Sequence, residues 1–242
     1  MSIDKAIDLI RGPAGTDVSL TILRDNDKEP RIFTITRATI TLPTVETNYR
    51  EKDGVFVISL YNFSAHSVEL FKDALEEYLA SGSDKLVLDL RGDPGGYLEA
   101  SVRIASMFLP QGSVVVKEIG KDPKEVTTHT TKGTPLFPEG HKLIILVDGG
   151  SASASEILAG ALSEHNIGTL VGTQTFGKGS VQEVINLSAD TAMKVTVAKW
   201  YTPHDISISD SGLTPKVKIE QSIDTKGVDK QLDEAVALFK KL

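Results

Sequence analysis

Two short segments contain residues that together could attack a carbonyl carbon. The first is the serine-rich run 151–156, Ser-Ala-Ser-Ala-Ser-Glu, and the second is 175–182, Thr-Phe-Gly-Lys-Gly-Ser-Val-Gln. A serine hydroxyl is a poor nucleophile until a neighbouring base takes its proton, and a lysine amine can be that base if a dry pocket keeps it uncharged. Ser153 and Lys178 are therefore the candidate nucleophile and base. The glycines on both sides of the lysine, with apolar residues nearby, predict such a pocket.

Ser153 also fits a purely structural role. Together with Glu156 it forms a capping-box sequence, and serines at helix starts are most often only caps. However, a helix that follows a buried strand begins with unpaired backbone N–H groups. The N–H of Ala154 is therefore a candidate donor to a tetrahedral oxyanion formed beside Ser153.

Segment 89–96, Asp-Leu-Arg-Gly-Asp-Pro-Gly-Gly, is the third candidate element of the site. A glycine pair after a buried strand permits positive φ angles and close backbone approach. The Gly96 N–H is the candidate second oxyanion donor. An ordinary strand-to-helix turn explains this segment equally well.

Other interpretations of the lysine segment are weaker. Residues 172–178 resemble a phosphate-binding loop, but Gly179 stands where that loop needs Ser or Thr, and 180–187 alternates like a strand. A surface lysine in a flexible loop stays open as an alternative. If 178–182 is extended, Gln182 lies on the same side as Lys178, because side chains there alternate with a period of two.

Composition limits the function classes. The chain has 242 residues, 40% of them hydrophobic, and a net charge of −7, which argues against a nucleic-acid partner. Zero cysteines exclude disulfides, thiolate metal sites and a cysteine nucleophile. The five histidines show no metal-ligand pairing at three- or four-residue spacing, and the serine–lysine hypothesis implies no metal or organic cofactor. A Ser-His-Asp triad through His165 is conceivable but has no specific support. No apolar run is long enough for a transmembrane helix.

Alternating strands and helices from about residue 54 predict an α/β core with parallel strands and crossover helices. The strands are expected at 55–60, 86–90, 143–147, 169–172 and 193–200, and the helices at 67–80, 98–109, from the serine run to about 163, and at 231–242. A helix followed by a β-hairpin is expected before this core, with the helix at 3–10 and the two strands at 18–24 and 31–36. This segment is too small to form a hydrophobic core of its own.

Taken together, these segments resemble the carboxyl-terminal processing peptidases, or tail-specific proteases, of peptidase family S41. The matching stretches are 88–96, 150–157, 170–182 and 197–203. The resemblance implies a crotonase/Clp-protease-like ββα superhelix core at 39–242. Segment 1–38 resembles the C-terminal half of a PDZ domain.

The resemblance also implies roles for single residues. The nucleophile falls on Ser153 rather than on Ser151 or Ser155, with Lys178 as general base and Gln182 completing the arrangement. Gly96 and Ala154 supply the oxyanion donors, and Glu164 falls where some members carry a functionally implicated aspartate. Asp93 stands where the family usually has asparagine and adds a negative charge near the proposed oxyanion hole.

The implied function is a serine endopeptidase that cleaves unstructured or misfolded proteins near free, apolar C-termini through an acyl-enzyme. The family resemblance implies an extracytoplasmic location, in the periplasm or at the outer face of the cell membrane, with the signal or anchor outside this chain. The missing PDZ half or a regulatory partner is expected to assist substrate capture, and homo-oligomerisation is left open. The alternative is a catalytically inactive scaffold or binding module that keeps the protease fold.

Overall fold

A computed structural model describes residues 3–24, 28–39, 43–188, 191–209, 211–221 and 229–241. The chain divides into two compact units, Met1–Leu42 and Pro43–Leu242. The boundary expected from the sequence, between residues 38 and 39, lies a few residues before this division.

The smaller unit is a helix followed by a hairpin. Helix α1 (Ile3–Ile10) precedes strands β1 (Asp17–Ile22) and β2 (Arg31–Thr36), which pair antiparallel. The Arg37 guanidinium links the two parts, since its Nε donates to the carbonyl of Ile10 at 2.7 Å. None of the unit's described side chains is buried, which agrees with the expectation that it is too small for its own core. Its identity as half of a PDZ domain stays a prediction.

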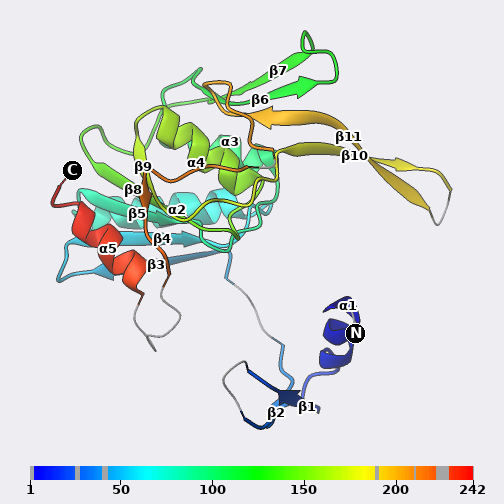
Figure 1. The fold of residues 1–242 in the computed structure, drawn as a ribbon. Coiled ribbons are helices and arrows are strands. Elements are labelled where there is room, and N and C mark those ends of the chain that lie inside the picture. Colours follow the sequence, from blue (N-terminus) through cyan, green and yellow to red (C-terminus); the bar gives the residue numbers. More distant parts are fainter. Residues whose placement is uncertain are drawn as a thin grey trace. The chain divides into compact units, whose positions relative to one another are not determined.

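The larger unit is built on a six-stranded sheet of order β12-β9-β8-β5-β4-β3 (Figure 1). All neighbouring strands pair parallel except β3, which lies antiparallel at one edge. The strands are β3 (Val45–Arg50), β4 (Val55–Leu60), β5 (Lys85–Asp89), β8 (Lys142–Val147), β9 (Gly168–Gly172) and β12 (Val217–Lys218).

Helices cover both faces of this sheet. Successive residues of its strands point to opposite faces, and the residues on each face are apolar. Ile58, Leu88 and Ile145 face a core shared with three helices, α2 (Ser67–Ala80), α3 (Leu98–Ala105) and α4 (Ala154–Glu164). Their neighbours Val57, Val87 and Ile144 pack on the other face against α5 (Lys230–Leu238). The three layers confirm the α/β class that the sequence predicts.

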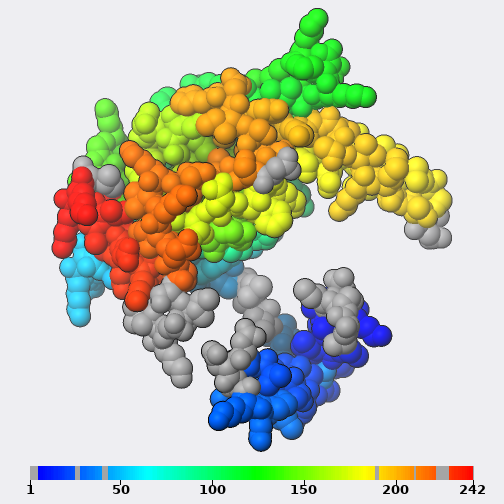
Figure 2. Space-filling view, viewed as in Figure 1, coloured from blue at the N-terminus to red at the C-terminus, as the bar shows by residue number. Residues whose placement is uncertain are grey.

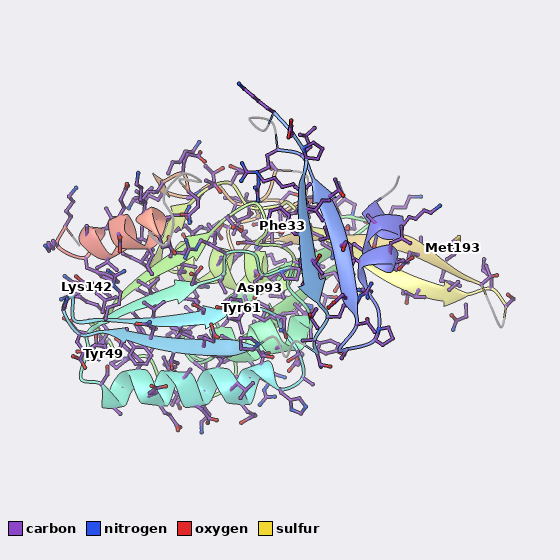
Figure 3. All side chains as sticks on the ribbon, turned by 90° about the horizontal axis from the view of Figure 1, so that it is seen from below. Phe33, Tyr49, Tyr61, Asp93, Lys142 and Met193 are labelled. Carbon is purple, nitrogen blue, oxygen red and sulfur yellow. The ribbon has the colours of Figure 1, made fainter. Side chains whose placement is uncertain are left out.

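A second, antiparallel sheet has the order β10-β11-β6-β7. Its strands are β6 (Val114–Gly120), β7 (Val126–Thr130), β10 (Ser180–Asn186) and β11 (Ala192–Tyr201). The far end of the β10–β11 hairpin projects as a yellow arm in Figure 2. Met193, labelled on this hairpin in Figure 3, is exposed, as is Ile185 opposite it.

The topology of the main sheet gathers the candidate residues. Strands β5, β8 and β9 are direct neighbours and run parallel, so their carboxyl ends meet at one edge of the sheet. The loops that leave these ends carry segment 90–97, the serine-rich run and segment 173–179. Open α/β sheets bind ligands at this edge, and the candidate site lies there.

Candidate active site

Ser153 occupies a strained turn between β8 and α4. It is the N-cap residue of α4, with φ 56° and ψ −116°. Positive φ is uncommon outside glycine and costs of order 1–3 kcal/mol, so such residues cluster at functional sites. The turn also has the capping-box pairing with Glu156 that the structural interpretation predicts. The two roles therefore coexist at Ser153.

The three serines of the run have different environments. Ser151 and Ser155 are fully buried, and their hydroxyls donate to the backbone carbonyls of Leu90 at 2.7 Å and Asp93 at 3.0 Å. Ser153 is partly exposed, and its hydroxyl donates to no acceptor within the described part of the chain. Of the three hydroxyls, only that of Ser153 is available to a substrate.

Two backbone N–H groups lie unpaired around this turn. Gly95 packs directly on it: a Cβ added at Gly95 would come within 2.8 Å of both Ser153 Cβ and the Ala154 nitrogen. The Gly95 N–H donates to Asp93 Oδ1, whereas the N–H groups of Gly96 and Ala154 meet no acceptor among the residues that the structure describes. The loop after β5 thus brings the predicted Gly96 donor to the serine turn, which itself contains the Ala154 donor.

Lys178 lies on the loop between β9 and β10. Its backbone N–H donates to Glu156 Oε2 at 2.9 Å. Its side chain is exposed, so the predicted dry pocket around the amine is wrong for this structure. Within the described residues, the Lys178 amine forms no ion pair, and no hydrogen bond joins it to the Ser153 hydroxyl. Topology brings the two residues to one site, but it leaves the proton-transfer contact unmade.

Glu156 joins the two loops, and the sequence analysis assigned it only a capping role. It is fully buried, and its Oε2 accepts the N–H groups of Ser153 and Lys178, each at 2.9 Å. Its Oε1 accepts the Gly177 N–H at 2.8 Å and the Thr175 hydroxyl at 2.5 Å. The capping-box spacing predicts the first of these contacts, whereas the other three depend on tertiary structure.

Two predicted supporting residues lie less favourably. Gln182 is exposed, and a β-bulge between Val181 and Gln182 breaks the alternation that predicted its side to match that of Lys178. Glu164 lies at the opposite end of α4 from Ser153, roughly 15 Å along a helix of 11 residues. There its carboxylate accepts the His204 backbone N–H at 2.7 Å. Glu164 therefore does not contact the serine turn.

An ion-pair network that the sequence analysis missed supports the loop after β5. Arg91 donates to the carboxylates of Asp89 and Asp229 and to the Gln231 side chain. Burial alone would lower the pKa of Arg91, but its hydrogen bonds to the two aspartates raise the pKa above its usual value. The network fastens this loop to the start of α5 at the other end of the sequence.

No group of three or more His, Asp or Glu residues within the described ranges could hold a metal ion. None of the described helices is long and apolar enough to cross a membrane.

Known proteins resemble this chain closely. A model of peptidase family S41 matches residues 54–219. The carboxy-terminal-processing protease of Bartonella bacilliformis is 38% identical over 240 residues, which cover 97% of this chain and 54% of that protein. The carboxyl-terminal-processing protease of Synechocystis is 38% identical over 226 residues, with 92% and 52% coverage. The solved structure of a photosystem II D1 C-terminal processing protease superposes with a TM-score of 0.73 at 27% identity, covering 98% of this chain and 63% of that one.

The chain thus spans about half the length of the curated relatives it matches. The family model covers most of the larger unit, including all three loops at the carboxyl edge of the sheet. On this evidence, the chain belongs to peptidase family S41.

Proposed function

We propose that this chain carries the catalytic core of a serine endopeptidase that cleaves polypeptides near their C-termini. Ser153 attacks the scissile carbonyl, and Lys178 accepts the hydroxyl proton and returns it to the leaving amine. The N–H groups of Gly96 and Ala154 hold the oxyanion. Water then releases the acyl group from Ser153. The names of the relatives support this reaction class.

One observation carries the proposal. Of the three serine hydroxyls, that of Ser153 is the one that donates to no acceptor among the described residues, and Ser153 is held at positive φ beside two unpaired N–H groups. A structural cap has no need of strain, of exposure or of free donors around it. These features together are what acyl transfer to serine requires.

The exposure of Lys178 adds a requirement for substrate. A lysine amine can accept the hydroxyl proton only in its uncharged form. A polypeptide bound across the site would cover this side chain, and removal from water favours the uncharged amine. We infer that the Ser153–Lys178 contact forms in the substrate complex, with Gln182 as a further hydrogen-bonding group on β10.

The test uses matched substitutions at the two residues. Ser153→Ala and Lys178→Ala should each reduce cleavage of an unfolded protein at least about 1,000-fold. Ser163→Ala, later on α4, and Lys199→Ala, on the exposed side of β11, should keep wild-type activity. Circular dichroism checks that all four proteins fold. Full activity in either of the first two variants would overturn the assignment.

The second candidate is an inactive scaffold that keeps the protease fold. The exposed lysine and the missing contact to Ser153 favour it for this chain taken alone. A fluorophosphonate probe, which labels activated serines, separates the two functions. Labelling mapped to Ser153 by mass spectrometry supports the enzyme, and its absence throughout the range from about pH 5 to 9 supports the scaffold.

Family resemblance supports protein substrates with free apolar C-termini and an extracytoplasmic location, in the periplasm or at the outer face of the membrane. The smaller unit would take part in substrate capture as half of a PDZ domain. Competition by peptides with free or amidated apolar C-termini tests the substrate class. Equal competition by both forms would exclude recognition of the terminal carboxylate.

A further inference from the structure

Asp93 is a buried carboxyl group in the loop after β5 (labelled in Figure 3). Its residue is 0% exposed. Its Oδ1 accepts the Gly95 N–H at 2.8 Å, but its Oδ2 is buried and has no hydrogen-bond partner in the described structure. Burial strongly disfavours the ionised form of a carboxyl group when one of its oxygens has no hydrogen-bond partner, and it disfavours the neutral acid much less.

Among the described residues, no basic side chain offsets the charge that Asp93 would carry when ionised. The nearest basic side chain in sequence, Arg91, is committed to Asp89 and Asp229, and that of Lys178 is exposed. The acidic groups on neighbouring elements also have their own donors: Asp148 accepts the Gly92 and Gly150 N–H groups, and Glu156 accepts the four donors described above. Burial therefore raises the pKa of Asp93 to about 7, although the Gly95 N–H and the Ser155 hydroxyl act in the opposite direction.

The backbone of Asp93 is fastened to the serine turn. Its carbonyl oxygen accepts the Ala152 N–H at 3.0 Å and the Ser155 hydroxyl at 3.0 Å. Its side chain holds Gly95, and Gly95 packs against Ser153. Asp93 is thus the side chain that shapes the loop carrying the Gly96 donor, and it lies beside the place where negative charge develops during the reaction.

We propose that Asp93 is a positioning residue that makes the oxyanion loop sensitive to pH: the loop supports catalysis while the carboxyl group is un-ionised and ceases to do so when it ionises. This inference rests on the proposed function. A negative charge on Asp93 opposes a second negative charge on the nearby oxyanion, and solvent screens it weakly because Asp93 is fully buried. Asparagine, which the family resemblance leads one to expect at this position, has the same shape and no charge to lose.

The expected pH profile has an alkaline limb. Activity falls above neutrality as Asp93 loses its proton. The wild-type kcat/KM should fall toward alkaline pH by up to about tenfold per pH unit. Asp93→Asn should remove this falling limb, so that the ratio of variant to wild type grows at least tenfold between about pH 7 and pH 9.

The experiment measures kcat/KM for a peptide substrate across this pH range. The matched control is Asp84→Asn, an exposed aspartate before β5, which should follow the wild-type profile. An alkaline limb that persists unchanged in Asp93→Asn would overturn the inference and leave the proposed function standing. Absence of both peptidase activity and probe labelling of Ser153 at every pH would overturn both.

A direct titration keeps the test valid if Asp93→Asn folds poorly. Carbon-13 NMR of aspartate carboxyl groups in the Ser153→Ala protein should show one resonance with a midpoint near neutral pH. Asp93→Glu in the same background assigns this resonance by its loss from the aspartate set. A set of aspartate resonances that all titrate below about pH 5 would overturn the inference, because Asp93 would then be ionised throughout the active range.

Discussion

Ser153 and Lys178 donate their backbone N–H groups to the same atom, Oε2 of Glu156, each at 2.9 Å. The proposed nucleophile and base come from loops after different strands, and this one oxygen fixes the distance between their backbones. The side chains remain free to adjust to a substrate. Glu156 is therefore the residue on which the relative placement of the pair depends.

Replacing Glu156 with Gln should damage both stability and activity. The carboxylate accepts four hydrogen bonds, and an amide would turn an NH₂ group toward donors that need an acceptor. We expect a loss of roughly 3 kcal/mol in the free energy of unfolding and about 100-fold or more in kcat/KM. Urea unfolding and a peptidase assay measure the two effects. Unfolding unchanged within about 0.5 kcal/mol would show that the network contributes little.

Alanine at Gly95 should misplace the serine turn. Gly95 has φ +92°, and an added Cβ would lie 2.5 Å from the Ala152 carbonyl oxygen and 2.8 Å from Ser153 Cβ. Strain and overlap together should cost about 3 kcal/mol, with most of the activity lost. Gly92→Ala is the control: its φ is +68° and nothing lies within 4 Å of its added Cβ, so only about 1 kcal/mol is expected. Equal losses in the two variants, measured by thermal unfolding, would contradict the packing argument.

Glu164→Gln should leave peptidase activity within about twofold of wild type. The side chain lies at the far end of α4 and accepts the His204 N–H, which glutamine can still do through its carbonyl oxygen. Steady-state kinetics test this expectation. A loss of more than tenfold with unchanged unfolding would restore the supporting role that the family resemblance suggests.

Asp93→Asn should change how stability depends on pH. The pKa of Asp93 is raised to about 7 in the folded chain from an ordinary value of 3.8. Between these two pH values, Asp93 is therefore ionised in the unfolded chain and still protonated in the folded chain. The free energy of unfolding therefore falls by up to about 4 kcal/mol as pH rises from about 4 to about 7, and it is constant above that range. The asparagine variant should lack this decline. Urea unfolding of both proteins at about pH 4.5 and pH 7.5 tests it, and parallel changes in the two would refute it.

Regular elements with clear periodicity were predictable from the sequence. The helix at 67–80 and the strand at 55–60 match α2 and β4, because their apolar residues repeat with one period throughout. Strand β3 was missed: Val45–Arg50 is mainly polar and is held at the sheet edge by pairing with β4. Strand β12 has only two residues, which is too short to show a hydrophobic alternation. Its place depends on pairing with β9.

In the candidate site too, features with a local sequence pattern could be predicted, whereas contacts between distant segments could not. Ser153, Gly96 and Ala154 could be proposed from the sequence because each follows from local chemistry at the end of a buried strand, and their catalytic roles stay predictions. The burial of Asp93 and three of the contacts of Glu156 depend on segments far apart in the sequence, so no local pattern contains them. The exposure of Lys178 was mispredicted, since flanking glycines shape a loop without determining what covers it.

The hydrogen bonds of Thr175 have a consequence for biosynthesis. Thr175 Oγ donates to Glu156 and accepts the Leu213 N–H at 2.7 Å, so the loop of the proposed base is held by a residue far downstream. A nascent chain can form the preceding strands of the main sheet before this residue has left the ribosome. The hydrogen bond that Leu213 makes with this loop forms only after Leu213 has emerged, so the proposed catalytic site stays incomplete in every shorter nascent chain.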